Sequence, residues 1–186
     1  MKFTLKPCGF DGIKNLEVQY ELLDEGMNPI LFCKSDWINE IYTLSGKSYI
    51  HDKSGKEIIF IHQEKINQSI YEIYVQGGHE DTLKRKPVYF RNEFSLEQCG
   101  WDIKIRMFPF VKVEILDGSQ IVAVIRRRWR LIGGIIPAGN IYKIDINEQY
   151  DFNKVLATVY TIIAYYLAFP NNKNNFLHLD DTYRKY

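Results

Sequence analysis

This sequence is poor in the features that identify several common classes of protein. It has three cysteines in 186 residues, Cys8, Cys33 and Cys99, which are far apart and form no CxxC pair. A disulfide framework or a zinc site is therefore not expected, and a reducing compartment fits this cysteine usage. The formal net charge is only +1, so no global field draws the protein to nucleic acid or to a membrane. Nucleic acid is accordingly an unfavoured partner, and any electrostatic function must come from a local patch.

Catalytic and ligand-binding motifs are also missing. There is no GxSxG, no cysteine stands beside a base, and Gly133-Gly134 lacks the Lys and Ser/Thr of a phosphate-binding loop. The four histidines do not have the spacing of a metal site; they are His51, His62, His79 and His178. We place His51 at a turn and His79 in a loop, with structural or solvated roles. The sequence therefore predicts a non-enzymatic protein with no metal and no cofactor.

No apolar run of signal-peptide length occurs at the N-terminus. We therefore expect a cytoplasmic protein that is not secreted. The length suits one domain with a substantial core. We expect this domain to cover residues 1–170, followed by a polar, Asn-rich tail over residues 171–186.

Aromatic residues, in contrast, are abundant. They make up 15% of the chain, with 13 Tyr and 11 Phe. Together with many Ile and Val residues, they favour β-structure, because such side chains pack well on a pleated surface.

One pattern recurs three times along the chain. An alternating run, an Asp, a small polar turn and a dense apolar run follow one another in residues 20–34, 49–65 and 113–126. Each segment is typical of a β-hairpin, in which Asp bonds nearby backbone N–H groups and Gly accepts a positive φ. The Asp and Gly pairs are Asp24 and Gly26, Asp52 and Gly55, and Asp117 and Gly118. An apolar residue stands two positions before each Asp, at Leu22, Ile50 and Ile115. Three unrelated hairpins are the alternative to a true repeat.

Further alternating runs indicate more strands, at residues 69–75, 101–107 and 141–146. We interpret Gly77-Gly78 together with residues 79–82 as a connecting turn. Ten to twelve closely spaced strands predict a mainly β fold, either a sandwich or a barrel.

The pattern changes after residue 150. Residues 155–169 contain no charge, no Gly and no Pro, and the segment lies between a possible N-cap at Asp151 or Asn153 and a stop at Pro170. A helix that is apolar on every side must be buried all round, in protein or in lipid. These 15 residues span about 22 Å, whereas a bilayer core needs roughly 20 residues and about 30 Å. We therefore favour a helix threaded through a closed barrel, with a transmembrane anchor as the alternative.

This arrangement resembles the LURP-one-related/tubby C-terminal-like superfamily. The resemblance lies in the hairpin at residues 49–58, in residues 113–129 and 140–145, and in the apolar segment that begins at Asp151. It covers most of residues 15–169 and implies a closed antiparallel barrel of about twelve strands around a buried hydrophobic C-terminal helix. The superfamily includes phosphoinositide-binding tubby proteins and phospholipid scramblases. The tubby phosphoinositide motif is not recognisable here, and the tail after Pro170 departs from the family pattern.

One charge cluster is a candidate site for anionic lipid. It consists of Arg126, Arg127, Arg128, Trp129 and Arg130. Arginines bind anionic headgroups, and a Trp suits the headgroup boundary. In a strand, Arg126, Arg128 and Arg130 share one face, and Arg127 and Trp129 share the other. The alternative is a solvated strand end whose Arg stems cover apolar surface. A second basic group, residues 84–86, is expected in a solvated loop.

Three functions remain open from the sequence. The first is a non-catalytic module that binds anionic phospholipid headgroups at a membrane surface, as the family resemblance and the Arg cluster suggest. The second is a protein-interaction or structural domain with an apolar barrel exterior, to which we assign Ile59, Ile61, Val122 and Val124. The third is scramblase-like lipid handling, which requires the terminal helix to enter the bilayer.

Overall fold

The fold is described from a computed structural model of the chain. It describes residues 1–11, 17–40, 43–63, 70–86, 92–106, 110–132 and 136–167. Within these ranges, the side chains of residues 9–11, 17–18, 36–40, 43–45, 92, 128–132, 136–140 and 166–167 are not described. The expected tail at residues 171–186 and the expected helix stop at Pro170 lie outside the described residues.

Twelve strands precede one helical segment. The strands are β1 (Lys2–Asp11), β2 (Glu17–Leu23), β3 (Pro29–Glu40), β4 (Thr43–His51), β5 (Glu57–Gln63), β6 (Ile70–Val75), β7 (Gly78–Arg85), β8 (Asn92–Leu96), β9 (Asp102–Arg106), β10 (Lys112–Asp117), β11 (Gln120–Ile132) and β12 (Ile136–Ile146). The helix α1 (Phe152–Ile162) continues into a π-helical turn, η2 (Ile163–Leu167).

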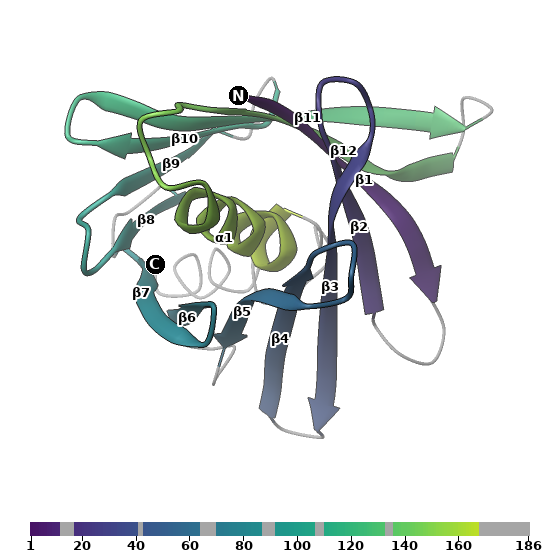
Figure 1. Cartoon of the computed structure of the whole chain (residues 1–186), viewed down its shortest axis with the longest axis horizontal. Helices are drawn as coiled ribbons and strands as arrows, with labels where there is room; N and C mark the ends of the chain where they lie inside the picture. Colours follow the sequence, from purple (N-terminus) through teal and green to yellow (C-terminus); the bar gives the residue numbers. More distant parts are fainter. Residues whose placement is uncertain are drawn as a thin grey trace, which may run out of the picture.

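The strands form one closed antiparallel barrel. Each strand pairs with its neighbours in the chain, and β1 closes the ring by pairing with β12. Helix α1 lies inside this ring (Figure 1). The predicted barrel around a C-terminal helix is therefore confirmed. Closure leaves no strand edge unpaired in the ring, which removes the usual route to edge-to-edge aggregation.

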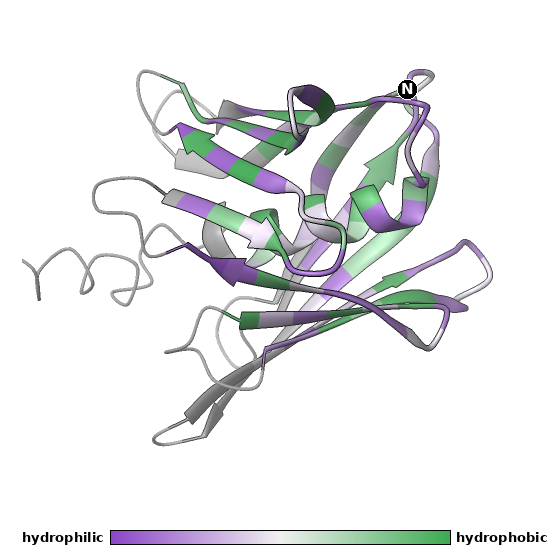
Figure 2. Ribbon diagram, turned by 90° about the vertical axis from the view of Figure 1, so that its left-hand side faces the viewer, coloured by the Kyte–Doolittle hydropathy of each residue, from purple (hydrophilic) through white to green (hydrophobic). Residues whose placement is uncertain are grey.

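The strand sequences alternate because one face of each strand meets the core. Hydrophobic and hydrophilic residues alternate along the strands in Figure 2. The three apolar residues that precede the hairpin aspartates, Leu22, Ile50 and Ile115, have no exposed surface. They lie on the inner face, as the recurring pattern predicts.

All three predicted hairpins are present, as β2–β3, β4–β5 and β10–β11. The Asp24 Oδ1 atom accepts a hydrogen bond from the Asn28 N–H at 2.8 Å. The Asp52 Oδ1 atom accepts one from the Ser54 N–H at 2.8 Å and another from the Lys56 N–H at 3.0 Å. The predicted capping role is therefore correct for these two aspartates.

The turn prediction was wrong in two details. In the first hairpin, Met27 rather than Gly26 has the positive φ, at 64°. In the third hairpin, Asp117 pairs with Gln120 in the register. Asp117 is therefore the last residue of its strand and not a turn residue, because the loop holds only two residues. Its carboxylate accepts a hydrogen bond from the Tyr150 hydroxyl at 3.3 Å.

The segment after Gly78 is a strand and not the predicted turn. Gln76 and Gly77 both have a positive φ, at 50° and 81°. Two consecutive positive φ values are those of a tight type I′ hairpin turn, whose twist matches the flanking strands. The chain therefore reverses within two residues, and β7 begins at Gly78. His79 and its neighbours up to Thr82 belong to β7.

The apolar residues that we assigned to the barrel exterior are buried. Ile59, Ile61 and Val122 have no exposed surface, and Val124 is 7% exposed. Ile59 and Ile61 occupy the buried positions of β5. A register shift between Ile115 and the following residue of β10 disturbs the alternation beside Val122. Ile59, Ile61 and Val122 are therefore core residues, whereas Val124 pairs with Glu114 and Asp145 on the outer face, where it is almost fully covered. These four residues do not form an exposed apolar surface.

The C-terminal helix is surrounded by the barrel along its described length. Every side chain from Val155 to Tyr165 is buried. Asp151 is the N-cap, since its Oδ1 atom accepts the Lys154 N–H at 2.8 Å. Burial of this segment contributes on the order of 10–20 kcal/mol of gross apolar transfer free energy.

Candidate functional site

The predicted arginine cluster is divided between the two faces of β11. Arg126 is exposed on the outer face and forms an ion pair with Asp145 on β12. Arg127 is half-buried and stands opposite the fully buried Tyr142 in the register, which places it on the inner face. Neighbouring arginines therefore point in opposite directions, as the strand alternation predicts.

The remaining members of the cluster are described only by their backbone. Arg128 pairs with Ile141, and Trp129 pairs with Asn140. A register shift between Trp129 and Leu131 then interrupts the ladder at Arg130. The side chains of Arg128, Trp129 and Arg130 lie outside the described residues, so a patch made of all five residues stays a prediction.

Arg126 belongs instead to a row of cations that crosses four strands. In the register, Arg106 of β9 pairs with Lys112 of β10, Lys112 pairs with Arg126 of β11, and Arg126 pairs with Lys143 of β12. We call these four residues the basic row. They alternate with the core residues Ile105, Val113, Ile125 and Ile144 and so lie on the outer face. With about 4.8 Å between strands, the row is roughly 14 Å long.

Two carboxylates lie beside the basic row. The Lys112 Nζ atom is 2.6 Å from the Glu114 Oε1 atom, and Arg106 is 3.7 Å from the same carboxylate. The hydrogen bond from Lys112 holds the pKa of Glu114 below its ordinary value. Lys143 donates from Nζ to the Thr4 hydroxyl at 2.7 Å. With Asp145 on Arg126, two negative groups face four positive ones, which leaves an excess of two positive charges.

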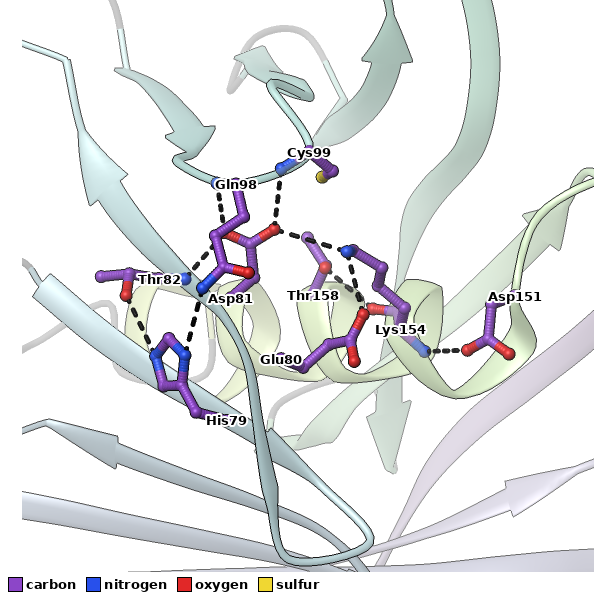
Figure 3. A network of polar contacts seen from close by, with 9 residues as sticks. All are labelled: His79, Glu80, Asp81, Thr82, Gln98, Cys99, Asp151, Lys154 and Thr158. Carbon is purple, nitrogen blue, oxygen red and sulfur yellow. Dashed lines mark hydrogen bonds and ion pairs between the residues drawn. The ribbon is translucent and has the colours of Figure 1, made fainter.

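A separate polar network joins α1 to the barrel wall (Figure 3). Its centre is Asp81 of β7, which has no exposed surface. The Asp81 Oδ1 atom accepts the N–H groups of Thr82 at 2.8 Å and Gln98 at 2.9 Å, and Oδ2 accepts the N–H of Cys99 at 3.1 Å. Burial alone raises the pKa of Asp81, but these hydrogen bonds outweigh it, and the pKa lies below its ordinary value.

Lys154 connects this carboxylate to the helix. Its Nζ atom is 3.5 Å from the Asp81 Oδ2 atom and donates to the Glu80 Oε1 atom at 2.9 Å. It also lies 5.8 Å from the ring centroid of Trp101, a cation–π distance. Burial opposes the charged form, yet the carboxylates keep the pKa of Lys154 above its ordinary value. The ammonium of Lys154 thus joins two carboxylates of β7, and the network holds the helix against the barrel wall.

Two of the three basic residues at 84–86 are not in a loop, and Lys86 follows directly after β7. Lys84 and Arg85 are part of β7. Lys84 pairs with Glu97, and Lys86 pairs with Asp102. Glu97 follows β8, and Asp102 is the first residue of β9. The side chains of Lys84 and Lys86 are therefore paired with carboxylates of the neighbouring part of the sheet.

At the other end of α1, four buried hydroxyl groups form a chain. The Tyr160 hydroxyl is 2.9 Å from the Ser35 Oγ atom, which is 2.8 Å from the Ser48 Oγ atom. Ser48 in turn donates to the Tyr165 hydroxyl at 3.1 Å. Burial raises the pKa of Tyr160 well above its ordinary value, so its hydroxyl stays protonated. This chain links the helix to β3 and β4.

Ring side chains line the outer face of the strands across the barrel from the basic row. Tyr49, Phe60 and Tyr74 follow one another in the register of β4, β5 and β6. Their centroids are 5.2 Å and 5.7 Å apart. We call these three residues the aromatic row. His51 stacks on Tyr49, His62 stacks on Phe60, and His79 lies edge-on to Tyr74. The alternating sequence of each strand carries this signal, but only the register shows that the rings adjoin.

The described residues hold neither a metal-binding cluster nor a membrane-spanning helix. Within the described ranges, no three His, Cys, Asp or Glu residues gather in a way that could hold a metal ion. The described part of the chain contains no helix with the length and hydrophobicity needed to cross a bilayer.

Comparisons with known proteins agree with the fold. The family model of LURP-one-related proteins matches residues 3–163. The search of curated proteins and the search of solved structures gave no match. The match runs from the second residue of β1 through β12 and α1 to the first residue of η2. The chain therefore belongs to the LURP-one-related family, within the tubby-like superfamily.

Proposed function

We propose that this domain is a non-catalytic module that binds anionic phospholipid headgroups at the cytoplasmic surface of a membrane. The observation that carries the proposal is the basic row, in which four strands bring Arg106, Lys112, Arg126 and Lys143 into one line on the outer face. Its excess of positive charge faces outward, where a planar array of phosphate groups can approach it.

The expected strength is modest. A Lys or Arg close to an anionic membrane surface contributes about 1 kcal/mol. Glu114 and Asp145 offset part of the attraction of the row. Binding should therefore be weak, reversible and sensitive to salt, because exposed charges are screened over about 8–10 Å at physiological ionic strength.

Vesicle sedimentation tests the proposal. The fourfold variant Arg106→Gln, Lys112→Gln, Arg126→Gln and Lys143→Gln should lose at least tenfold in binding to phosphatidylcholine vesicles that contain phosphatidylserine. Neither protein should bind vesicles of phosphatidylcholine alone.

A matched control removes the same amount of charge elsewhere. Its substitutions are Lys34→Gln, Lys47→Gln, Lys53→Gln and Lys56→Gln, which lie on and between β3, β4 and β5. This control should bind almost as well as the unaltered protein. Equal binding by the basic-row variant and the unaltered protein, or an equal loss in the control, would remove the proposal.

A protein-interaction role is the second candidate, and the aromatic row favours it. Tyr49, Phe60 and Tyr74 present adjoining rings on the outer face, and the neighbouring Phe32 is 38% exposed. Aromatic residues are enriched at the centres of protein interfaces. A substitution such as Phe60→Ser that abolishes capture of a defined protein partner, without altering vesicle binding, would support this candidate.

The scramblase-like alternative requires α1 to leave the barrel. The polar contacts at both ends of the helix count against it. Burial of every described side chain between them also counts against it.

A further inference from the structure

The buried hydroxyl chain has a single direction. A hydroxyl group carries one proton to donate. Because Ser48 donates to Tyr165, its contact with Ser35 must be one in which Ser35 donates. Ser35 has then used its own proton, so Tyr160 donates to Ser35. The order of donation therefore runs from Tyr160 through both serines to Tyr165, and it links two points on the helix through the wall.

The π-helical turn explains how both tyrosines reach the same wall. Tyr160 and Tyr165 are five residues apart, and in a regular α-helix such residues point about 140° away from each other. A π turn bonds an N–H to the carbonyl five residues earlier and rotates less per residue than an α-helix, so it reduces the angle between the two tyrosines. The turn begins at Ile163, between the two tyrosines. Their partners Ser35 and Ser48 face each other in the register of β3 and β4.

Gly46 leaves space for one of these tyrosines. A Cβ atom at this position would lie 2.5 Å from the Tyr165 Cε1 atom. Gly46 stands two residues before Ser48 and therefore on the same face of β4. The ring of Tyr165 also packs on Tyr71, with centroids 4.9 Å apart. The tyrosine thus occupies a socket formed by a missing side chain, a hydroxyl group and a ring.

We propose that the hydroxyl chain, the π turn and Gly46 together form a pin that fixes the rotation and depth of the C-terminal helix in the barrel. Apolar contacts are non-directional, and this helix is apolar on all sides, so such contacts alone permit several rotations of similar energy. Hydrogen bonds are directional, and only one rotation completes this chain. The helix is then a fixed axis, and ligands of the barrel exterior bind without its release.

The test of the pin is whether the helix adopts one packing arrangement in the barrel, in addition to how stable the protein is. The protein is labelled with fluorotyrosine, and the ¹⁹F resonance of Tyr165 is identified by its loss in Tyr165→Phe. In the unaltered protein this resonance should be single and sharp. In Ser35→Ala/Ser48→Ala it should split or broaden, and the backbone amides of residues 155–165 should exchange with solvent at least tenfold faster than before, while the amides of β9 to β12 change less.

Thr161→Val is the matched control. Thr161 is also buried, but its hydroxyl donates to the Ala157 carbonyl within the helix at 2.7 Å and not to the wall. The control should leave the Tyr165 resonance single. If the double serine variant does not fold, Ser48→Ala alone provides the same reading. A sharp, single resonance in the serine variants, or equal broadening in Thr161→Val, would overturn the pin.

Discussion

The two ends of the C-terminal helix are attached to the barrel by different chemistry. At the N-terminal end, Lys154 and Asp81 are charged, and three backbone N–H groups also hold the carboxylate. At the C-terminal end, the contacts between Tyr160, Tyr165 and two serines are neutral hydroxyl bonds. A buried charge costs far more than a buried hydroxyl unless it is fully partnered. The charged contact is therefore found where backbone N–H groups of β7 and of the turn after β8 both donate to the carboxylate. The neutral contact is found where serine side chains of β3 and β4 face the helix.

Placing a charge at the neutral end should have the largest effect. Ile163 has no exposed surface, and Ile163→Asp would bury a carboxylate without the donors that surround Asp81. We expect a loss of well over about 4 kcal/mol, which is a large part of the roughly 5–15 kcal/mol by which a domain is stable. The variant should be insoluble or lack cooperative unfolding in urea followed by circular dichroism. A soluble variant that unfolds cooperatively would contradict burial of the helix.

Removing the carboxylate at the charged end should have the next largest effect. Asp81→Ala leaves Lys154 and three backbone N–H groups without their buried acceptor, which should cost about 3–5 kcal/mol. Glu80→Ala serves as the comparison, because Glu80 is partly exposed and contacts Lys154 from one side. It should cost less than about 1 kcal/mol. Urea denaturation gives both values, and equal losses would show that Asp81 has no special role.

A methyl group in the tyrosine socket should have a smaller effect. Gly46→Ala forces the Tyr165 ring to move, and overpacking of this kind costs about 1–3 kcal/mol. Gly78→Ala is the matched strand glycine, since the nearest atom to its added Cβ would be the Val75 carbonyl oxygen at an ordinary 3.7 Å. Thermal unfolding should separate the two variants. An unchanged melting temperature for Gly46→Ala would mean that the socket tolerates the methyl group.

The smallest expected effect is on the pH dependence of stability, to which only the charged end of the helix should contribute. The pKa of Asp81 is lowered in the folded protein, so its stabilising contribution is present above the ordinary value of about 3.9. That contribution is lost as the pH falls through the lower folded pKa. Asp81→Asn should therefore show a shallower acid-induced loss of stability than the unaltered protein. Denaturation curves of both proteins at neutral and acidic pH measure this. If the two proteins lost stability equally in acid, the ionised Asp81 carboxylate would not stabilise the fold.

The raised pKa of Lys154 predicts a loss of stability at alkaline pH. Its contribution is present below the ordinary lysine value of about 10.4 and is lost as the pH rises through the higher folded pKa. No comparable alkaline loss is expected from Thr161, whose hydroxyl does not titrate in this range. Lys154→Met should therefore remove part of the alkaline loss that the unaltered protein shows.

Local patterns in the sequence predicted the scaffold well. The alternation around Ile50 and Ile115 indicated which side chains face inward, and the uncharged run over residues 155–169 indicated a buried axis. These signals are short in range, because strand period and helix capping depend on neighbouring residues. The boundary at Gly78 was missed, since a two-residue turn with a non-glycine residue at a positive φ has no strong composition signal.

The candidate site was predictable only in part. Arg126 was identified from its arginine neighbours, whereas Arg106, Lys112 and Lys143 each stand alone in the sequence. Only the register of four strands places them in one row. The partners of Tyr160 and Tyr165 were hidden for the same reason, because Ser35 and Ser48 lie more than a hundred residues earlier in the chain.

Thiol labelling of the helix centre would test most directly whether the barrel itself encloses the apolar segment. Ala157 has no exposed surface, so Ala157→Cys, made in a variant whose three native cysteines are replaced, introduces a probe at the axis. We predict that a maleimide reacts with this thiol only as fast as the whole protein unfolds, with or without phosphatidylserine vesicles. Rapid labelling in buffer, or protection that depends on vesicles, would show that the helix is covered by something other than the barrel.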